Sequence, residues 1–385
     1  MHESKIWPVH PRRLPDELLS SWLIRIAQAQ GIKLHTFTQR AFPNYSVWNR
    51  DIDKTAPDGL LTILSQRTGR SLSEVYQSTL RSYEGYLFET LIPGNTKWIL
   101  PVGVYHRTRK RNGLAICPLC LAESNTPYFR RLWRIGFTVV CTKHSAWMID
   151  ECPICKYPIC FHRNDFEHKY NATEKGMNIC YNCQFDYIYS DVKIETDQLF
   201  LTFLSNLEET LSKGYIEFGD TYVYSHLYFC VLHQLVKLLC ISESGIKLRH
   251  LLELESNFTY DYTLHNQTNF VETLSISGRR HTLRLISYLL EDLPKSFILA
   301  CKKANITKSR LEKDMKVIPF WYFQILRNYL DETSYGPNYD EIKVACNYLQ
   351  NINQPISRKA LKDLMGFIDS KKINKYYNLI FKKRG

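Results

Sequence analysis

Several features common in other protein classes are missing from this sequence of 385 residues. Glycine and proline are few, at 16 and 15, which excludes collagen-like and low-complexity chains. The longest apolar stretch, residues 228–240, includes His233, Gln234 and Lys237 and is too short and too polar to cross a bilayer. The first 13 residues lack the apolar core of a secretory signal. We therefore expect a soluble, cytoplasmic protein with no membrane partner.

Motifs of several enzyme classes are also absent. The sequence contains no glycine loop of the form GxxxxGK[ST] or GxGxxG, and neither GxSxG nor HExxH occurs. Its carboxylates are scattered, so any grouping of them into a nuclease site would be arbitrary. We predict a non-catalytic protein without catalytic residues.

Twelve cysteines are present, and in a reducing cytoplasm they are more typical of metal ligands or buried thiols than of disulfides. Eight of them fall between residues 117 and 183, where four short motifs each place two ligand-type residues three positions apart, with two residues between them. Such a pair can turn toward one ion, and two pairs complete the tetrahedral shell of structural zinc. The predicted ligands are Cys117, Cys120, Cys141, His144, Cys152, Cys155, Cys180 and Cys183.

Two groupings of these ligands are compatible with the spacing. In the sequential grouping, the first four residues hold one zinc ion and the last four hold a second. In a cross-braced grouping, the first pair joins the third and the second joins the fourth. Both groupings give each ion four protein ligands, whereas catalytic zinc needs an open position, so we predict two structural ions. Isolated cysteines such as Cys230 and Cys301 are expected to be core thiols.

Positive charge predominates, with 50 Lys and Arg against 38 Asp and Glu, and it is concentrated in short blocks. Residues 277–316 carry 10 basic against 4 acidic residues, and residues 357–385 carry 9 against 2. A further run precedes the first cysteine motif. We predict contacts with nucleic acid or a partner at Arg107, Arg109, Lys110, Arg111, Lys308, Arg310, Lys313, Arg358, Lys359 and Lys362, although such runs can also be plain solvated surface.

Apolar periodicity predicts a mainly α, multidomain protein. Residues 1–116 are expected to form an N-terminal helical domain with a helix-turn-helix, in which Gly31 ends the first helix, and Ser71 with Glu74 fits a capping box. Residues 117–194 form the tandem zinc-binding module. Residues 195–385 are expected to be a C-terminal helical domain with basic helix-turn-helix-like segments, including a recognition helix starting after Thr307 and another helix capped by Ser357.

Two segments together resemble a known family. The opening Trp7-Pro8 and the run from Pro15 to Ala27, PDELLSSWLIRIA, are followed by Cys117-Pro-Leu-Cys120, an aromatic stretch and Cys141-Thr-Lys-His144. This order over roughly residues 5–190 is similar to the TniQ/TnsD family of transposon target-selection proteins, most of all to the TniQ proteins of CRISPR-associated transposons.

The resemblance implies a bacterial, non-catalytic adaptor that chooses where a transposon inserts. Its implied partners are a Cascade-type effector with guide RNA, a AAA+ ATPase regulator similar to TnsC, duplex DNA and a second copy of the chain. The TnsD type, which reads a fixed DNA site directly, is the alternative, and the chain beyond residue 195 is shorter than in those longer members. A zinc-containing transcription regulator also remains open, as does a nuclease or transposase.

Overall fold

The computed structural model is mainly helical and describes most of the chain. The described residues are 6–92, 94–102, 111–160, 163, 176–218, 221–242, 245–258, 270–330 and 338–365. The chain forms two compact units, residues 1–325 and 326–385, which are considered separately below. The predicted domain boundaries at residues 116 and 194 both fall inside the first unit. Among the described helices, none combines the length and apolar composition that a bilayer span requires.

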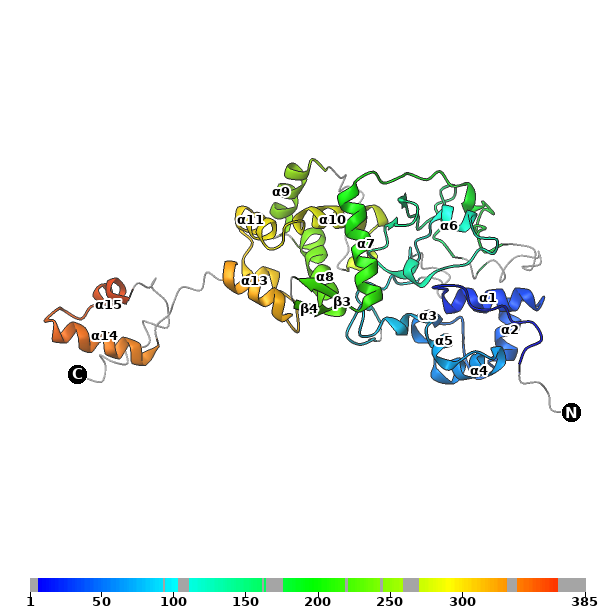
Figure 1. Ribbon diagram of the computed structural model, residues 1–385, viewed down its shortest axis with the longest axis horizontal. Coiled ribbons are helices and arrows are strands. Elements are labelled where there is room, and N and C mark those ends of the chain that lie inside the picture. The colour runs from blue at the N-terminus through cyan, green and yellow to red at the C-terminus, as the bar shows by residue number, and fades with distance from the viewer. Residues whose placement is uncertain are drawn as a thin grey trace. The chain divides into compact units, whose positions relative to one another are not determined.

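Five helices lie together in the blue part of Figure 1 and build the N-terminal part of the first unit. They are α1 (Leu19–Ala29), α2 (Leu34–Ala41), α3 (Ile52–Thr55), α4 (Asp58–Thr68) and α5 (Leu72–Tyr76). Between α1 and α2, Gly31 adopts φ 65°, a left-handed conformation that suits glycine and ends the first helix as predicted. Ser71 and Glu74 form the predicted capping box of α5.

The segment from residue 111 to 194 has little regular structure. It contains α6 (Pro118–Ala122), β1 (Val140–Cys141) and β2 (Ala146–Trp147). The two strands pair antiparallel with Val140 opposite Trp147 and Cys141 opposite Ala146. Such a loop-rich stretch cannot bury enough apolar surface by itself, so its order has to come from its neighbours or from bound metal.

The remainder of the first unit is a helical bundle with one β-hairpin. Its elements are α7 (Gln198–Lys213), β3 (Tyr215–Phe218), β4 (Thr221–Tyr224), α8 (Ser225–Ile241), α9 (Ile246–Ser256), α10 (Ile276–Leu289), α11 (Lys295–Lys303) and α12 (Lys308–Leu311). Helix α10 contacts α7, α8 and α9. The core includes Phe229 and Leu232 of α8 with Leu285 and Ile286 of α10, all almost fully buried.

Helix α13 (Phe320–Leu330) spans the boundary between the units. The C-terminal unit itself contains α14 (Tyr339–Asn351) and α15 (Arg358–Met365), which pack against each other. Their small core consists of Ile342, Ala345, Cys346, Leu349 and Leu361.

Candidate metal centres

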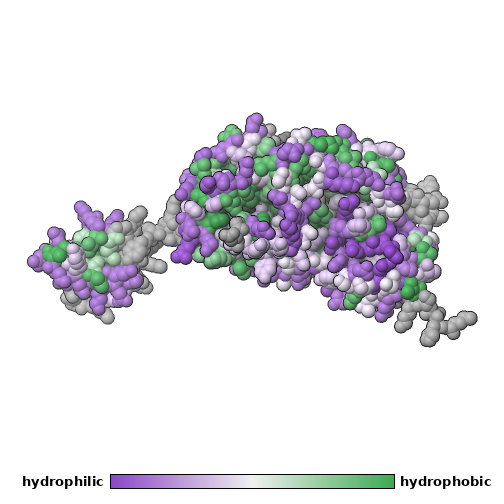
Figure 2. All heavy atoms as spheres, viewed as in Figure 1, coloured by the Kyte–Doolittle hydropathy of each residue, from purple (hydrophilic) through white to green (hydrophobic). Residues whose placement is uncertain are grey.

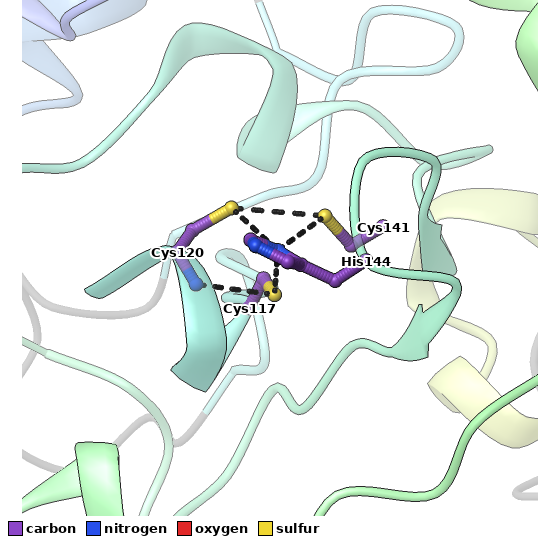
Figure 3. Close-up of side chains that lie close together, drawn as sticks. All are labelled: Cys117, Cys120, Cys141 and His144. Carbon is purple, nitrogen blue, oxygen red and sulfur yellow. Dashed lines mark hydrogen bonds between the residues drawn. The ribbon is translucent and has the colours of Figure 1, made fainter. Parts of the chain in front are cut away.

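Three cysteines and one histidine converge between α6 and the β1–β2 hairpin (Figure 3). The Nδ1 atom of His144 lies 3.5 Å from the Sγ of Cys117, 3.3 Å from that of Cys120 and 3.6 Å from that of Cys141. The Sγ atoms of Cys120 and Cys141 are 3.7 Å apart. A tetrahedral zinc ion with Zn–S bonds of about 2.3 Å requires sulfur atoms about 3.8 Å apart. The four donor atoms therefore match the shell of one metal ion.

Local structure positions each half of this first cluster. Cys117 is the N-cap of α6 and Pro118 occupies its first turn, so Cys120 lies one turn further on the same side. The backbone N–H of Cys120 donates to the Sγ of Cys117 over 3.5 Å, an interaction that stabilises a thiolate. On the other half, the turn between β1 and β2 is closed by Ser145 at φ 50°, which lets His144 face back toward Cys141.

Hydrogen bonds among the thiols already favour one ionised sulfur. Those from Cys117 and Cys120 hold the pKa of Cys141 well below its usual range. A bound cation extends this preference to all three thiols, because metal-ligating cysteines are thiolates.

Glu123 orients the histidine ligand. The Nε2 of His144 donates to the Glu123 carboxylate over 2.7 Å, and Lys143 binds the other carboxylate oxygen. Those two contacts, with Lys143 first, lower the pKa of Glu123. A carboxylate on the far nitrogen fixes the tautomer that leaves Nδ1 free to ligate, as is usual around zinc-bound histidines. The sequence argument did not identify Glu123, although its position three residues after Cys120, at the C-cap of the same short helix, was a usable signal.

The second cluster is built from two matching turns. Cys152 and Cys155 lie in the first turn, and Cys180 and Cys183 lie in the other. In each turn the first cysteine donates its backbone N–H across the turn, from Cys152 to the Tyr157 carbonyl at 2.8 Å and from Cys180 to the Phe185 carbonyl at 2.7 Å. The residue after each second cysteine, Lys156 or Gln184, is left-handed.

In the second cluster, each sulfur of one turn lies close to a sulfur of the other turn. Cys152 lies 3.6 Å from Cys183, and Cys155 lies 3.7 Å from Cys180, measured between Sγ atoms. The structure therefore brings the eight predicted ligands together in the sequential grouping and not in the cross-braced one. Each cluster could hold one metal ion with four protein donors. Cys301, expected to be a core thiol, is fully buried, and Cys230 is half-buried.

The opening helix is fastened to the aromatic stretch that joins the two halves of the first cluster. The Asp16 carboxylate accepts from the Nε of Arg131 at 2.9 Å and from the Leu132 N–H at 3.1 Å. The backbone N–H of Leu18 donates to the Phe129 carbonyl, and the N–H of Phe129 donates to the Ser21 hydroxyl. These contacts explain why the run Pro15 to Ala27 and the first cysteine motifs occur together: the two segments form one folded body.

A buried ion pair strengthens the same junction. Arg134, only 2% exposed, binds Asp51 and Asp53, while Asp53 also accepts from the N–H and hydroxyl of Ser20. Burial raises the pKa of Asp53 to about 6, and the nearby guanidinium of Arg134 opposes that rise. Because the buried Asp53 of α3 binds both Ser20 of α1 and Arg134, it holds α1, α3 and the metal-binding segment together.

The first cluster is also linked to the helical bundle. Trp147, in β2, donates from Nε1 to the Glu195 carboxylate at 3.1 Å. The guanidinium of Arg280 in α10 lies 3.6 Å from the centre of the Trp147 ring, a cation–π contact. Arg284 of the same helix binds Glu195. The hairpin that carries Cys141 and His144 thus rests on α10.

The predicted basic contacts are distributed unevenly. Arg107, Arg109 and Lys110 lie outside the described residues, and Arg111 is exposed. The recognition helix expected after Thr307 is wrong in extent: α12 covers only Lys308–Leu311, the Thr307 side chain does not cap it, and Lys313 lies beyond its end. The chain turns there because Asp314 is left-handed and its carboxylate binds Lys237 of α8. Arg358, Lys359 and Lys362 are all exposed on α15.

Comparison with known protein families gives a match that covers the residues of this folded body. No curated protein matches the chain significantly. The TniQ family model matches residues 8–147, which include α1 to α5 and every ligand of the first cluster. The second cluster lies beyond the matched residues. The chain therefore contains a TniQ domain over residues 8–147, which implies a protein associated with target selection in transposition.

Proposed function

We propose that this protein is a non-catalytic adaptor that links a Cascade-type, guide-RNA effector to a AAA+ regulator of transposition. The TniQ domain carries this proposal, because it places the chain in the target-selection step. Specificity for the insertion site then comes from base pairing in the effector, and this chain supplies a rigid connection.

The rigidity of that connection is proposed to depend on two zinc ions. Sulfur and imidazole nitrogen are preferred zinc donors, and the observed donor spacing fits the tetrahedral shell. Four protein donors leave no open coordination position, so the ions fold the segment and take no part in chemistry. The first ion would hold the α6 turn against the β1–β2 hairpin, which contacts α10, and would fix both ends of the stretch whose Phe129 binds Ser21 of α1.

Direct recognition of a DNA site, as in the TnsD type, is the second candidate. The observation that favours it is the exposed basic side of α15, which packs against α14 through Leu361. In that case the protein would bind duplex DNA without a guide RNA and still deliver the site to the AAA+ regulator.

Affinity purification from cells that express the native gene neighbourhood tests the two candidates. We expect the tagged chain to recover a guide RNA together with Cascade subunits, and the mass of the complex gives the number of copies of the chain. Recovery of duplex DNA or the AAA+ regulator without guide RNA would favour the TnsD type instead. A Cys120→Ser chain is the control, because a partner that binds the folded body should be lost with the first metal ion.

A further inference from the structure

The β3–β4 hairpin of the first unit has one covered face and one open face. Its covered face carries Ile216, Phe218 and Val223. The ring of Phe218 stacks on Trp321 of α13 with centroids 4.9 Å apart, and Val223 is buried. Figure 1 shows both strands beside α8 and α13. Because side chains alternate between the two faces along a strand, the remaining side chains lie on the open face.

Three tyrosines and one carboxylate make up this open face. The strand register sets Tyr215 opposite Tyr224 and Glu217 opposite Tyr222. Tyr222 and Tyr224 are each 69% exposed, and the rings of Tyr215 and Tyr222 meet edge to face at 5.4 Å. Figure 2 shows hydrophilic and hydrophobic side chains interspersed over the visible surface of the first unit. Docking there relies on mixed polar and apolar contacts, which tyrosine supplies and for which it is enriched at interfaces.

The outer edge of β4 is open as well. The N–H of Ser225 donates to the Gly214 carbonyl, which fixes the alternation of hydrogen-bonded pairs along the hairpin. By that alternation, the backbone N–H and C=O of Tyr222 and the N–H of Tyr224 point away from β3. Among the described residues, no third strand pairs with this sheet. Such an edge can accept an extended peptide as an added strand.

The charge at this hairpin is negative. Residues 214–224 contain two carboxylates and no lysine or arginine. Lys213 precedes them, close enough for its charge to interact with Glu217, but it is bound by Glu209 at 2.7 Å. Tyrosine rings attract guanidinium and ammonium groups over their faces, and an adjacent carboxylate adds an ion pair. Nucleic-acid bases also stack on tyrosine, but the carboxylates repel their phosphates, so the face fits a basic protein segment better.

We propose that the β3–β4 hairpin docks an extended, arginine-bearing segment of a protein partner as a third strand along β4. In an added strand, alternate side chains lie on one face at the spacing of Tyr222 and Tyr224. Two guanidinium groups can then lie over these rings, and one can reach across Tyr222 to Glu217. This deepens the proposed function and rests on it, because an adaptor has to dock proteins and the hairpin is one surface where it would do so.

The test uses the purified full chain loaded with zinc and a short fluorescent peptide in which arginine alternates with threonine, followed by anisotropy. A peptide with citrulline in place of arginine keeps the shape and loses the charge, so it should bind at least about 10-fold more weakly. A peptide whose arginines are methylated on the backbone nitrogen loses the donors to β4 and should also bind about 10-fold more weakly. Both comparisons leave the protein unaltered.

Two variants locate the contact on the chain. Tyr222→Ala combined with Tyr224→Ala should weaken binding of the arginine peptide between about 10-fold and about 30-fold, and Glu217→Gln between about 3-fold and about 10-fold. The matched controls Tyr189→Ala and Glu291→Gln remove an exposed ring and an exposed carboxylate from other parts of the first unit. They should change the affinity less than about twofold. Far-ultraviolet circular dichroism verifies that each variant is folded.

Several outcomes would overturn the proposal. Absence of binding by the arginine peptide would do so, as would equal binding of the citrulline peptide. Unchanged binding by the double tyrosine variant, or an equal loss in Tyr189→Ala, would show that the hairpin is not the docking surface. Tighter binding of a single-stranded oligonucleotide than of the peptide would assign the tyrosines to base stacking instead.

Failure of this surface is distinguishable from failure of the proposed function. The peptide assay contains only this chain and the peptide, whereas adaptor function is read from the purified complex. If the wild-type chain binds the peptide but recovers neither effector nor regulator, the adaptor role fails and the docking surface stands. If the chain recovers both partners, and does so equally well with both tyrosines replaced and without binding the peptide, the adaptor role stands and this surface fails.

Discussion

The two metal clusters use the same kind of short ligand motif and differ in what surrounds them. In the first, the three cysteines are at most 8% exposed, and both halves contact other parts of the folded body. In the second, Cys155 is half-buried and Cys183 is exposed, and both turns are closed mainly by their own backbone hydrogen bonds. The first cluster lies within the residues that match the TniQ model, and the second lies outside them.

This difference shows that equivalent ligand sets can have unequal structural roles. The stretch between Cys120 and Cys141 contains the residues that fasten α1, including Phe129 and Arg131, so loss of the first ion would loosen the whole N-terminal part. Loss of the second ion would act first on the segment around its own turns, which contains none of these contacts to α1. The following variants test that contrast.

The largest effect is expected for Cys120→Ser. A serine hydroxyl holds zinc poorly, so the bound zinc should fall from two ions to one, and the free energy of unfolding should drop by more than about 4 kcal/mol. Metal content by mass spectrometry and urea unfolding followed by tryptophan fluorescence give the two quantities.

Cys301→Ser is the matched control, since Cys301 is a fully buried thiol that belongs to neither cluster. It should keep two ions and lose only the smaller energy of a buried polar substitution. Two ions retained by Cys120→Ser would show that the first ligand set is misassigned.

A smaller effect is expected for Cys183→Ser. One ion should again be lost, but unfolding of the N-terminal part should change by only about 1–2 kcal/mol, because the residues that bind α1, such as Phe129, lie outside these turns. Limited proteolysis should cut first between residues 152 and 183. A loss of stability equal to that of Cys120→Ser would remove the contrast between the clusters.

Much of the metal chemistry was predictable from the sequence because it is local. A gap of two residues between ligands is a property of short turns, and so is the capping box of α5. The grouping of Cys117 with Cys141 and not with Cys152 is decided by packing between distant segments, for which spacing carries no information. The same limit explains the short α12, because the contact from Lys237 to Asp314 joins residues 77 positions apart.

The docking of the opening helix illustrates what a resemblance can and cannot supply. The joint presence of Asp16, Ser21 and the cysteine motifs indicated a family. It did not indicate that Asp16 binds Arg131 or that Ser21 receives the N–H of Phe129. Both contacts need the tertiary structure, since more than 100 residues separate each pair.

The smallest and most specific effect is expected for Glu123→Gln. The amide keeps the size of the side chain but loses the charge that orients His144 and binds Lys143. Both zinc ions should remain bound, while transfer of one ion to a competing chelator should become about 10-fold easier, the lower end of what second contacts to metal-ligating histidines contribute. Glu209→Gln, an exposed carboxylate paired with Lys213 on α7, is the control and should transfer zinc as the wild type does. Unchanged transfer in Glu123→Gln would mean that the backbone of the β1–β2 turn alone orients His144. In that case the difference between the clusters would rest on packing and not on the hydrogen bond that Glu123 accepts from His144.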